Sequence, residues 1–588
     1  MERSVDNRLA EAASDYLRLH ADNPVDWREW GDAAFEEARE RGVPVFASVG
    51  YATCHWCHVM ARESFADPEI GRLLREGFVA IKVDREERPD VDAALMGAAS
   101  AFTRSLGWPL SVFLTPDGLP FYAGTYFPPT ARQGLPGFRE LLTAIGQAYR
   151  EQADAVLETA AQVQEALRES AQGAGGEAPT AAEARAALAA VASVEDPEHG
   201  GLGTSQKFPQ PGLIVALADA ETAKLAPGLA ERLLDAAAGD DAVVAAGGYS
   251  HLRGRDGGFF RYATQRDWSV PHFERMLVDN AQLLHASTLL GRDTIARGIV
   301  GFLGDVLHLP SGAFAVAEDA ESTVDGRRVE GGWHLAPDPS APGVERPPLD
   351  RLVVTAANGL AIEALAVRAL RDRDDRALDL ARDAAEHLLE HHAADPSALV
   401  HASLDGRPSS AAATAADAGG FAAGLLALTA ATGEARWAIA ARALLESAPD
   451  PARVAGRGPA LQLGFDSDGD APSGRAALAG ALQALYALTG DAAHLDAASR
   501  VLDASLAMRN PLAGAATLRV AALLAEPPRT SVLIGDPPPE LRREPGAVLA
   551  SPEQAAELAA AGFSLFEGKS SPGAYRCTGF VCDLPQPF

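Results

Sequence analysis

The sequence predicts a multidomain protein in which an α/β region precedes a long helical region and a short α/β segment. Residues 1–135 alternate helical and strand-like patterns, whereas residues 181–525 are almost wholly Ala- and Leu-rich helical segments. A run of Gly, Ala and Pro at 171–180 has the composition of a linker. The 588 residues are enough for about three or four domains of ordinary size. We therefore expect units at 1–135, 136–180 (a helix and the linker), 181–525 and 526–588.

The charge and the cysteine count exclude several classes of protein. The chain has 80 acidic and 51 basic residues, and its net charge of −29 repels nucleic acid and anionic membranes, so we expect neither as a partner. Four Cys are too few for a disulfide-stapled secreted scaffold. The first ten residues lack the apolar core of a signal peptide, and no apolar run reaches the length of about 18 residues that suggests a membrane span. We therefore expect a cytoplasmic protein.

Within the first unit, apolar and β-branched runs alternate with amphipathic patterns. The expected order is β-α-β-α-β-β with a helix in front. The strands are expected at 43–49, 78–84, 109–115 and 119–126, and the helices at 30–41, 54–76 (broken near 67–68) and 91–104. A charged helical pattern then covers 137–170. Further helices are expected at 211–224, 273–291, 358–371, 374–392, 417–432, 435–447 and 475–489, and the last unit should have strands at 531–535 and 546–550 with a helix at 552–561.

Cys54 and Cys57 form a C-x-x-C motif where a predicted strand ends and a helix begins. The unpaired N–H groups and the dipole of a helix N-terminus stabilise a thiolate there. We expect Cys54 to be an exposed nucleophile that attacks a disulfide, and Cys57, one turn further on and more buried, to resolve the mixed disulfide. His55 and His58 are candidates for lowering the pKa of the thiols further.

Three other interpretations of the motif stay open. The two Cys can be inert buried thiols, or, because His58 completes a C-x-x-C-H pattern, a site of c-type haem attachment. They can also bind a metal together with His58, or with Cys577 and Cys582 near the end of the chain. We favour the redox interpretation, which requires no organic cofactor and no metal.

Pro109 supports the redox interpretation because it stands at the start of a predicted strand, where a cis peptide bond is tolerated. In thioredoxin-like folds, a Pro at such a position packs beside the reactive Cys. We therefore expect Pro109 to shape the substrate groove.

Several motifs match one known family. They are His20-Ala-Asp-Asn-Pro-Val-Asp-Trp27, Gly50-Tyr-Ala-Thr-Cys-His-Trp-Cys-His-Val-Met60, Lys82-Val-Asp-Arg-Glu-Glu-Arg-Pro-Asp90 and Gly124-Thr-Tyr-Phe-Pro128. The chain resembles the thioredoxin-domain family that includes the spermatogenesis-associated protein 20 type. The resemblance implies an α/β thioredoxin-like N-terminal domain joined to an (α/α)6 barrel of the six-hairpin glycosidase type. The pattern at 526–588 adds a small C-terminal α/β tail to this expected multidomain fold. The activity of the family is poorly defined.

Polar loops of the helical region are candidates for lining a cleft at the mouth of such a barrel. The candidate residues are Arg261, Tyr262, His272, Glu274, Asp279, Asn280, Glu318, Asp319, Asp417 and Asp468, with further acids at Glu321 and Asp470. We expect a helix to begin near Pro271 and to place His272, Arg275, Met276 and Asp279 on one face. Paired carboxylates there suit acid–base chemistry on a sugar, as in a glycosidase, and His272 suits proton transfer in an epimerase. Alternatively, these acids cap helices and pair with Arg.

The sequence departs from the family pattern at four positions of this presumed cleft. Ser250 stands where an Asp normally precedes His251, Phe260 where His is usual, Ala357 where Trp is usual and Ala418 where Tyr is usual. The loss of these groups weakens a catalytic role on sugars, whereas the C-x-x-C motif is intact.

The second cysteine pair, Cys577 and Cys582, has a four-residue gap unlike that of a redox motif. It can be a disulfide, half of a metal site or a resolving pair for the N-terminal thiols. The leading hypothesis is a thiol-disulfide oxidoreductase or redox-regulated protein that acts on a protein disulfide or a small molecule. The alternatives are a carbohydrate-active or carbohydrate-binding barrel in which the thioredoxin unit is structural, and an interaction scaffold.

Overall fold

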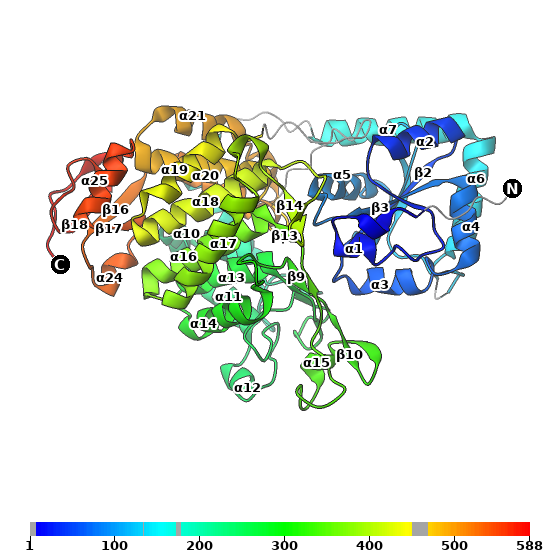
Figure 1. Cartoon of the computed structure of the whole chain (residues 1–588), viewed down its shortest axis with the longest axis horizontal. Helices are drawn as coiled ribbons and strands as arrows, with labels where there is room; N and C mark the ends of the chain where they lie inside the picture. The colour runs from blue at the N-terminus through cyan, green and yellow to red at the C-terminus, as the bar shows by residue number, and fades with distance from the viewer. Residues whose placement is uncertain (1–6, 133, 172–177, 450–467) are drawn as a thin grey trace.

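The computed structural model describes residues 7–132, 134–171, 178–449 and 468–588. Figure 1 shows the α/β N-terminal part at one end of the molecule, the helical part in the middle and the C-terminal segment at the opposite end. The first six residues, residue 133, most of the expected linker (172–177) and residues 450–467 lie outside the described part.

A five-stranded mixed sheet is the centre of the N-terminal part. Its order is β1-β3-β2-β4-β5; β1, β3 and β2 run parallel, and β4 and β5 join as antiparallel strands. Strands β2, β3 and β4 are buried along their whole length, because helices cover both faces of the sheet. The strands are β1 (Trp27–Glu29), β2 (Val45–Gly50), β3 (Val79–Asp84), β4 (Leu110–Leu114) and β5 (Pro120–Gly124).

The predicted β-α-β-α-β-β order is confirmed, and the structure adds the short strand β1. The helix expected at 54–76 is two helices, because the Asp67 carboxylate caps a new helix that has Pro68 in its first turn. The helices of this part are α1 (Asp15–Arg18), α2 (Asp32–Arg41), α3 (His55–Arg62), α4 (Pro68–Gly77), α5 (Pro89–Ala99), α6 (Phe138–Glu151) and α7 (Ala153–Ala171). Helix α6 packs against α4, and α7 against α5 and β5, so both belong to the N-terminal part.

In the described part of the chain, six inner helices pack side by side in a closed ring, in the order α9, α13, α16, α18, α20, α23 and back to α9. Each inner helix packs against one outer helix, which gives an α/α barrel of helix pairs. The inner helices are α9 (Pro211–Leu217), α13 (Leu277–Leu289), α16 (Thr355–Asp372), α18 (Ala415–Thr432), α20 (Gly474–Thr489) and α23 (Ala515–Leu524). The outer helices, in the same order, are α11 (Leu229–Ala238), α14 (Asp293–Phe302), α17 (Asp375–His391), α19 (Ala435–Glu446), α21 (Ala492–Val501) and α8 (Ala181–Ala189).

Burial explains which helices are inner and which are outer. Helix α17 is amphipathic, with its buried residues at helical spacing from Ala377 to Leu388, whereas α18 is apolar almost all round. Inner helices α16 and α18 approach closely at Gly359, where an added Cβ would lie 2.5 Å from the backbone of Gly420. Among the described residues, α18 is the one helix long and apolar enough to cross a membrane, and 67% of it is buried in the protein.

Short strands absent from the prediction connect the barrel helices. Strands β12, β9 and β8 form one small sheet, β10 and β11 form a hairpin, and β13, β14 and β15 form another sheet. Their bounds are β6 (Tyr262–Ala263), β7 (Pro271–His272), β8 (Arg275–Met276), β9 (Ala317–Glu318), β10 (Glu321–Val324), β11 (Arg327–Glu330), β12 (Leu349–Asp350), β13 (Val353–Val354), β14 (Ala402–Leu404) and β15 (Arg407–Pro408). The remaining short helices are α10 (Ala220–Leu225), α12 (Asp241–Ala245), α15 (Gly332–Leu335), α22 (Ser505–Arg509) and α24 (Pro539–Arg542).

The expected helix near Pro271 is wrong. Residues 271–272 pair with β6 and residues 275–276 pair with β9, so α13 begins only at Leu277. His272, Arg275 and Met276 therefore do not share a helix face with Asp279. The reason is tertiary: pairing with strands distant in the sequence replaces the local helical pattern.

The C-terminal segment is a four-stranded sheet of order β17-β16-β18-β19 with one longer helix, α25 (Pro552–Ala560). The strands expected at 531–535 and 546–550 are present as β16 (Arg529–Ile534) and β17 (Ala547–Ala550). The strands β18 (Gly573–Thr578) and β19 (Val581–Cys582) were not predicted. Strand β17 packs on α18, which attaches the segment to the barrel.

Candidate active site at the cysteine motif

The C-x-x-C motif lies where β2 meets α3, as the sequence predicts. Cys54 is the N-cap residue of α3, and the backbone N–H of Cys57 donates a hydrogen bond to Cys54 Sγ over 3.2 Å. The two cysteines form a disulfide. The helix N-terminus thus directs an N–H donor at the sulfur of the first cysteine, which stabilises a thiolate once the disulfide opens.

The expected exposure of Cys54 is wrong. Its exposed fraction is 4% and that of Cys57 is 2%, so both cysteines are buried. Loops of the helical part cover the motif. The Tyr51 hydroxyl donates a hydrogen bond to Glu274 Oε1 over 2.9 Å, and the Thr53 hydroxyl donates to Glu274 Oε2 over 3.4 Å. A site that was expected to be open to solvent is therefore closed by another part of the same chain.

Gly50 makes close packing beneath the disulfide possible. A Cβ on Gly50 would lie 2.3 Å from the Tyr16 hydroxyl and 2.7 Å from Cys57 Sγ. The Tyr16 hydroxyl is buried and has no hydrogen-bond partner among the described residues. Glycine at position 50 therefore brings a phenol and the second sulfur of the motif next to each other.

Pro109 follows a cis peptide bond after Trp108 and directly precedes β4, which pairs with β2. The Trp108 ring lies edge-on to Tyr51, with 5.8 Å between ring centroids, and its indole N–H donates to Asp92 over 2.8 Å. The cis bond and the position at the strand start agree with the sequence. The role of Pro109 in a substrate groove stays a prediction.

Both histidines of the motif face carboxylates of the helical part. His55 Nδ1 lies 2.9 Å from Glu321 Oε1, and His58 Nε2 lies 3.4 Å from Asp319 Oδ2. Arg62 also donates two hydrogen bonds to Glu321, over 2.9 and 3.0 Å. Burial of Glu321 would raise its pKa, but the hydrogen bonds from His55 and Arg62 hold the pKa well below its usual range. The contacts of His55 and Arg62 with Glu321 therefore connect helix α3 to the β10–β11 hairpin.

A second charged cluster lies behind Tyr51. Arg261 donates to the Tyr51 hydroxyl, to Glu274 over 3.0 Å and to Asp470 over 2.5 Å. Arg85, from the N-terminal part, donates to the same Asp470 oxygen over 3.0 Å. Burial and the two guanidinium groups act in opposite directions on Asp470, and the Arg charges prevail, with a pKa of about 2.

A cavity of about 350 Å³ at the barrel mouth contains part of the predicted cleft. Arg261, Asp279 and Asp468 line it together with Asp470. Asp279 Oδ2 is buried and has no hydrogen-bond partner among the described residues, and burial, followed by the charge of Asp470, raises the pKa of Asp279 well above its usual range. Phe208 on the cavity wall stacks on Tyr262, with 4.9 Å between ring centroids.

The other predicted cleft residues have structural partners and do not line this cavity. Arg275 pairs with Glu318, and Asn280 bonds the backbone of Phe259. Arg328 donates to Asp319 over 2.5 Å. His401 pairs with Asp417 over 2.8 Å. His272 Nδ1 lies 2.7 Å from Glu330, so the expected proton carrier is paired outside the cavity. Asp468, which does line the cavity, also has structural partners, because it accepts from the backbone N–H groups of Ser473 and Thr517.

Tyr51, Arg85 and Glu330 were not predicted as site residues. Tyr51 and Arg85 lie inside the family motifs, three residues before Cys54 and three after Lys82, so their sequence positions carried a signal. Glu330 is in a hairpin that the sequence did not predict, and nothing near it in the sequence marks it.

A cavity of about 430 Å³ borders the motif. Ala52 and Thr53, just before Cys54, and His58, one turn after it, form one wall. Asp319, between β9 and β10, Arg328 on β11 and Asp350 on β12 also line it, and they come from the helical part of the chain. This cavity is therefore bounded by both parts of the chain.

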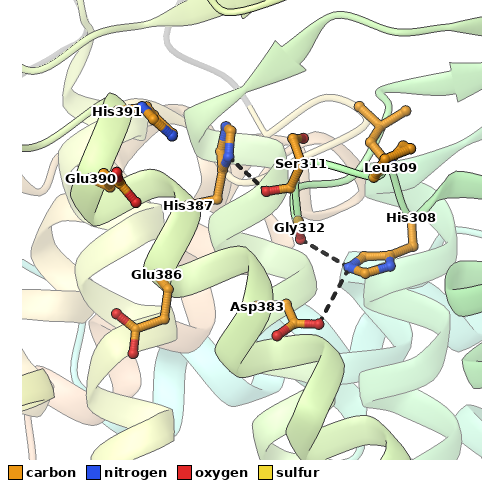
Figure 2. Close-up of a pocket in the computed structure, with 10 residues that line it drawn as sticks. His308, Leu309, Ser311, Gly312, Asp383, Glu386, His387, Glu390 and His391 are labelled. Carbon is orange, nitrogen blue, oxygen red and sulfur yellow. Dashed lines mark hydrogen bonds and ion pairs between the residues drawn. The ribbon is translucent and has the colours of Figure 1, made fainter.

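The largest of the described cavities, about 550 Å³, lies away from the cysteines, between α17 and the loop 308–312. Figure 2 shows His308 directed at Asp383 and at the carbonyl of Gly312, and His387 directed at the carbonyl of Ser311. Across the described ranges, no group of three or more His, Cys, Asp or Glu residues is placed to hold a metal ion.

The second cysteine pair is a disulfide between neighbouring strands. Cys577 on β18 lies opposite Cys582 on β19, and the two are bonded. This segment and α3 lie at opposite ends of the molecule (Figure 1). Of the three interpretations left open by the sequence, the structure shows the intramolecular disulfide.

Comparison with known proteins confirms the predicted resemblance. Residues 6–168 match the family model Thioredox_DsbH, described as "Protein of unknown function, DUF255". Spermatogenesis-associated protein 20 of Homo sapiens is 40% identical over 344 residues, which are 56% of this chain and 44% of that protein. The Rattus norvegicus protein of the same name is 39% identical over 327 residues, 54% of this chain and 41% of that protein. The chain spans less than half the length of these curated relatives.

Some solved structures also match part of this chain at low sequence identity. The match to a D-mannose isomerase has a TM-score of 0.38 and 12% sequence identity, and it covers 54% of this chain and 83% of the isomerase chain. The cellobiose 2-epimerase from Spirochaeta thermophila DSM 6192 has a TM-score of 0.38 and 17% identity, with 55% and 84% covered.

Proposed function

We propose that this chain, which is related to the spermatogenesis-associated protein 20 type, is a thiol-disulfide oxidoreductase whose N-terminal part is a thioredoxin-like domain. The observation that carries the proposal is the Cys54–Cys57 disulfide at the N-terminus of α3. The match of residues 6–168 to a thioredoxin-type family model supports it.

The proposed chemistry is a dithiol–disulfide exchange. In the reduced protein, the Cys54 thiolate attacks one sulfur of a substrate disulfide, the substrate S–S bond breaks, and the first substrate thiolate leaves and takes up a proton. Cys57 loses its proton and attacks Cys54 Sγ, which releases the second substrate thiol and forms the Cys54–Cys57 disulfide. Two electrons pass from the protein to the substrate, and a thiol reductant restores the dithiol.

The test is turnover of a chromogenic aromatic disulfide with dithiothreitol as reductant, corrected for the rate without protein. We expect Cys54→Ser to abolish the protein-dependent rate. Reduced Cys57→Ser, freed of dithiothreitol before it is mixed with the disulfide, should stop at a mixed disulfide on Cys54 that is detectable by mass. Cys577→Ser/Cys582→Ser is the control and should keep the full rate. A Cys54→Ser variant as active as the unmodified protein would overturn the proposal.

A second candidate function is carbohydrate binding or chemistry at the barrel mouth, and one observation favours it. Asp279 and Asp470 share the 350 Å³ cavity, and their pKa values are shifted in opposite directions, which is the arrangement of an acid–base pair. Calorimetry with a panel of mono- and disaccharides tests it. Binding that Asp279→Asn removes and His272→Ala leaves intact would support it, whereas no heat with any sugar would refute it.

A further inference from the structure

The burial of the cysteine pair restricts what can reach it. With exposed fractions of 4% and 2%, neither sulfur is presented on an outer surface. The covering loops are fixed through Glu274 and Glu321, which are themselves buried and bond Tyr51, Thr53, His55 and Arg62. A folded protein substrate would have to displace these bonds before its disulfide could contact Cys54, because an enzyme–substrate thiol exchange needs the sulfurs in contact.

The 430 Å³ cavity offers a route for a small molecule. Ala52 and Thr53, the two residues before Cys54, and His58, one helical turn after it, line this cavity, so it lies next to the segment that carries Cys54. The volume lies in the range of about 300–1,000 Å³ that is typical of sites for small ligands. A ligand of amino-acid or dipeptide size fits a space of this volume.

The polar groups of this cavity have both signs of charge. Arg18 and Arg328 line it together with Asp15, Asp319 and Asp350. Asp319 is paired with Arg328, and Asp15 lies 3.2 Å from Arg351, so these charges are already balanced in part by the protein. Arg18 donates a hydrogen bond from Nε to the carbonyl of Ala12 over 2.7 Å, and its terminal Nη1 group lies 3.7 Å from Asp405.

Asp350 is the buried acid of the cavity. Its exposed fraction is 2%, and it accepts a hydrogen bond from the backbone N–H of Leu352 over 3.2 Å. Burial is the main cause that raises its pKa to about 7. A ligand ammonium group beside Asp350 would stabilise its ionised form, and a ligand carboxylate would pair with Arg18.

We propose that the substrate of the Cys54–Cys57 site is a low-molecular-weight disulfide that carries both ammonium and carboxylate groups and enters through this cavity. The proposal rests on the proposed thiol-disulfide activity. Arg18 binds a substrate carboxylate and Asp350 binds a substrate ammonium group, so that one sulfur of the substrate lies against Cys54. The exchange then follows the two steps given above, with two substrate thiols released for each protein disulfide formed.

The test is a single-turnover experiment. Protein reduced with dithiothreitol and freed of excess reductant is mixed with one of four disulfides, and the mass of the quenched protein reports oxidation of Cys54 and Cys57. The four are cystine (both charges), cystamine (ammonium only), dithiodiglycolate (carboxylate only) and insulin (a protein disulfide). We expect cystine to react roughly tenfold faster than cystamine and dithiodiglycolate, as loss of one charged hydrogen bond implies, and insulin to react slowest.

Two variants test which charged group of the substrate Arg18 and Asp350 each bind. Arg18→Gln should slow the reaction with cystine and leave that with cystamine unchanged, and Asp350→Asn should slow cystine and leave dithiodiglycolate unchanged. Arg39→Gln is the matched control, because Arg39 pairs with exposed Asp117 outside the cavity.

The outcomes separate this inference from the proposed function. Oxidation by insulin as fast as by cystine, still dependent on Cys54, overturns the small-substrate inference and leaves the oxidoreductase in place. Equal rates for the three small disulfides, or an Arg18→Gln variant with an unchanged cystine-to-cystamine ratio, also overturn the inference. If none of the four oxidises the Cys54–Cys57 dithiol, the proposed function itself fails.

Discussion

The Tyr51 hydroxyl, three residues before the first cysteine of the motif, donates a 2.9 Å hydrogen bond to Glu274, 223 positions further along the chain. Glu274 is fully buried and also accepts from Arg261 over 3.0 Å. Burial is the main cause that raises the pKa of Tyr51 well above its usual range, so the phenol stays protonated and keeps its donor. The loop that presents Cys54 is therefore bound to the barrel by a neutral donor and a buried carboxylate.

Tyr51→Phe should destabilise the protein by about 1–3 kcal/mol, because one oxygen of buried Glu274 loses a donor. Glu274→Gln should cost more, because it leaves the Arg261 guanidinium with a weaker buried partner. Chemical denaturation measures both. The matched control is Tyr122→Phe on β5 of the N-terminal part, where the ring is partly buried. A Tyr51→Phe variant no less stable than Tyr122→Phe would contradict the role given to this bond.

Stability should depend on pH through His401. Burial alone would lower its pKa, but the charge of Asp417 and a 2.8 Å hydrogen bond raise it to about 9. Because folding raises the pKa of His401, protonated His401 stabilises the folded protein. This stabilisation is complete below the unfolded-state pKa of about 6.5 and is lost as the pH rises through about 9.

The unfolding free energy should therefore fall by roughly 3 kcal/mol between pH 6.5 and 9.5 through this pair. Asp417→Asn should remove most of this pH dependence. The control is His494→Gln, which replaces a partly exposed histidine of α21 and should leave the pH dependence unchanged. Denaturant titrations at several pH values decide. An Asp417→Asn curve parallel to that of the unmodified protein would count against the pair.

Gly50→Ala should disturb the cysteine site directly. The new Cβ would meet the Tyr16 hydroxyl and Cys57 Sγ at distances that require one of them to move. We expect a loss of about 1–3 kcal/mol and a changed rate of reduction of the Cys54–Cys57 disulfide. Gly77→Ala is the control, because an added Cβ there meets nothing within 4 Å. Adding Tyr16→Phe to Gly50→Ala should restore part of the stability; no restoration would show that the hydroxyl is not the obstacle.

Removal of the second disulfide should affect stability and not exchange chemistry. Cys577→Ser/Cys582→Ser opens a short loop between β18 and β19, which should cost roughly 2 kcal/mol. The Cys54-dependent reaction with cystine should keep its rate. A slower reaction would instead connect the two disulfides, which lie at opposite ends of the molecule (Figure 1).

The sequence was enough to predict the local structure around Cys54 and Pro109. It was not enough to predict the barrel loops that bury the cysteines. A β-branched run followed by C-x-x-C was enough to place Cys54 at a helix start, and the Pro at 109 was enough to anticipate a cis bond. The burial of Cys54 depends on Glu274 and Glu321, more than 200 residues away. No periodicity or composition near Cys54 contains that information.

The same distinction explains the barrel loops. Helices such as α16 and α18 follow from their own apolar patterns and were expected within a few residues of their bounds. The segment at Pro271 forms strands because partners at Tyr262 and Ala317 are available in the fold. The sequence singled out the charged residues of those loops as candidates for a cleft or, alternatively, as partners of Arg, and the structure pairs Glu318 with Arg275 and Asp319 with Arg328.

The interface between the N-terminal part and the barrel, formed by the hydrogen bonds of Tyr51, Thr53 and His55 to Glu274 and Glu321, has a thermodynamic consequence. Tyr51, Thr53 and His55 are bonded to the barrel and flank Cys54, so reduction of the disulfide and attachment of the two parts form a closed cycle. If reduction of the disulfide changes the free energy of this interface, the interface changes the free energy of reduction of the cysteines by the same amount, and so shifts their reduction potential. A ligand that binds the barrel loops preferentially in one oxidation state would therefore shift that potential without touching either sulfur.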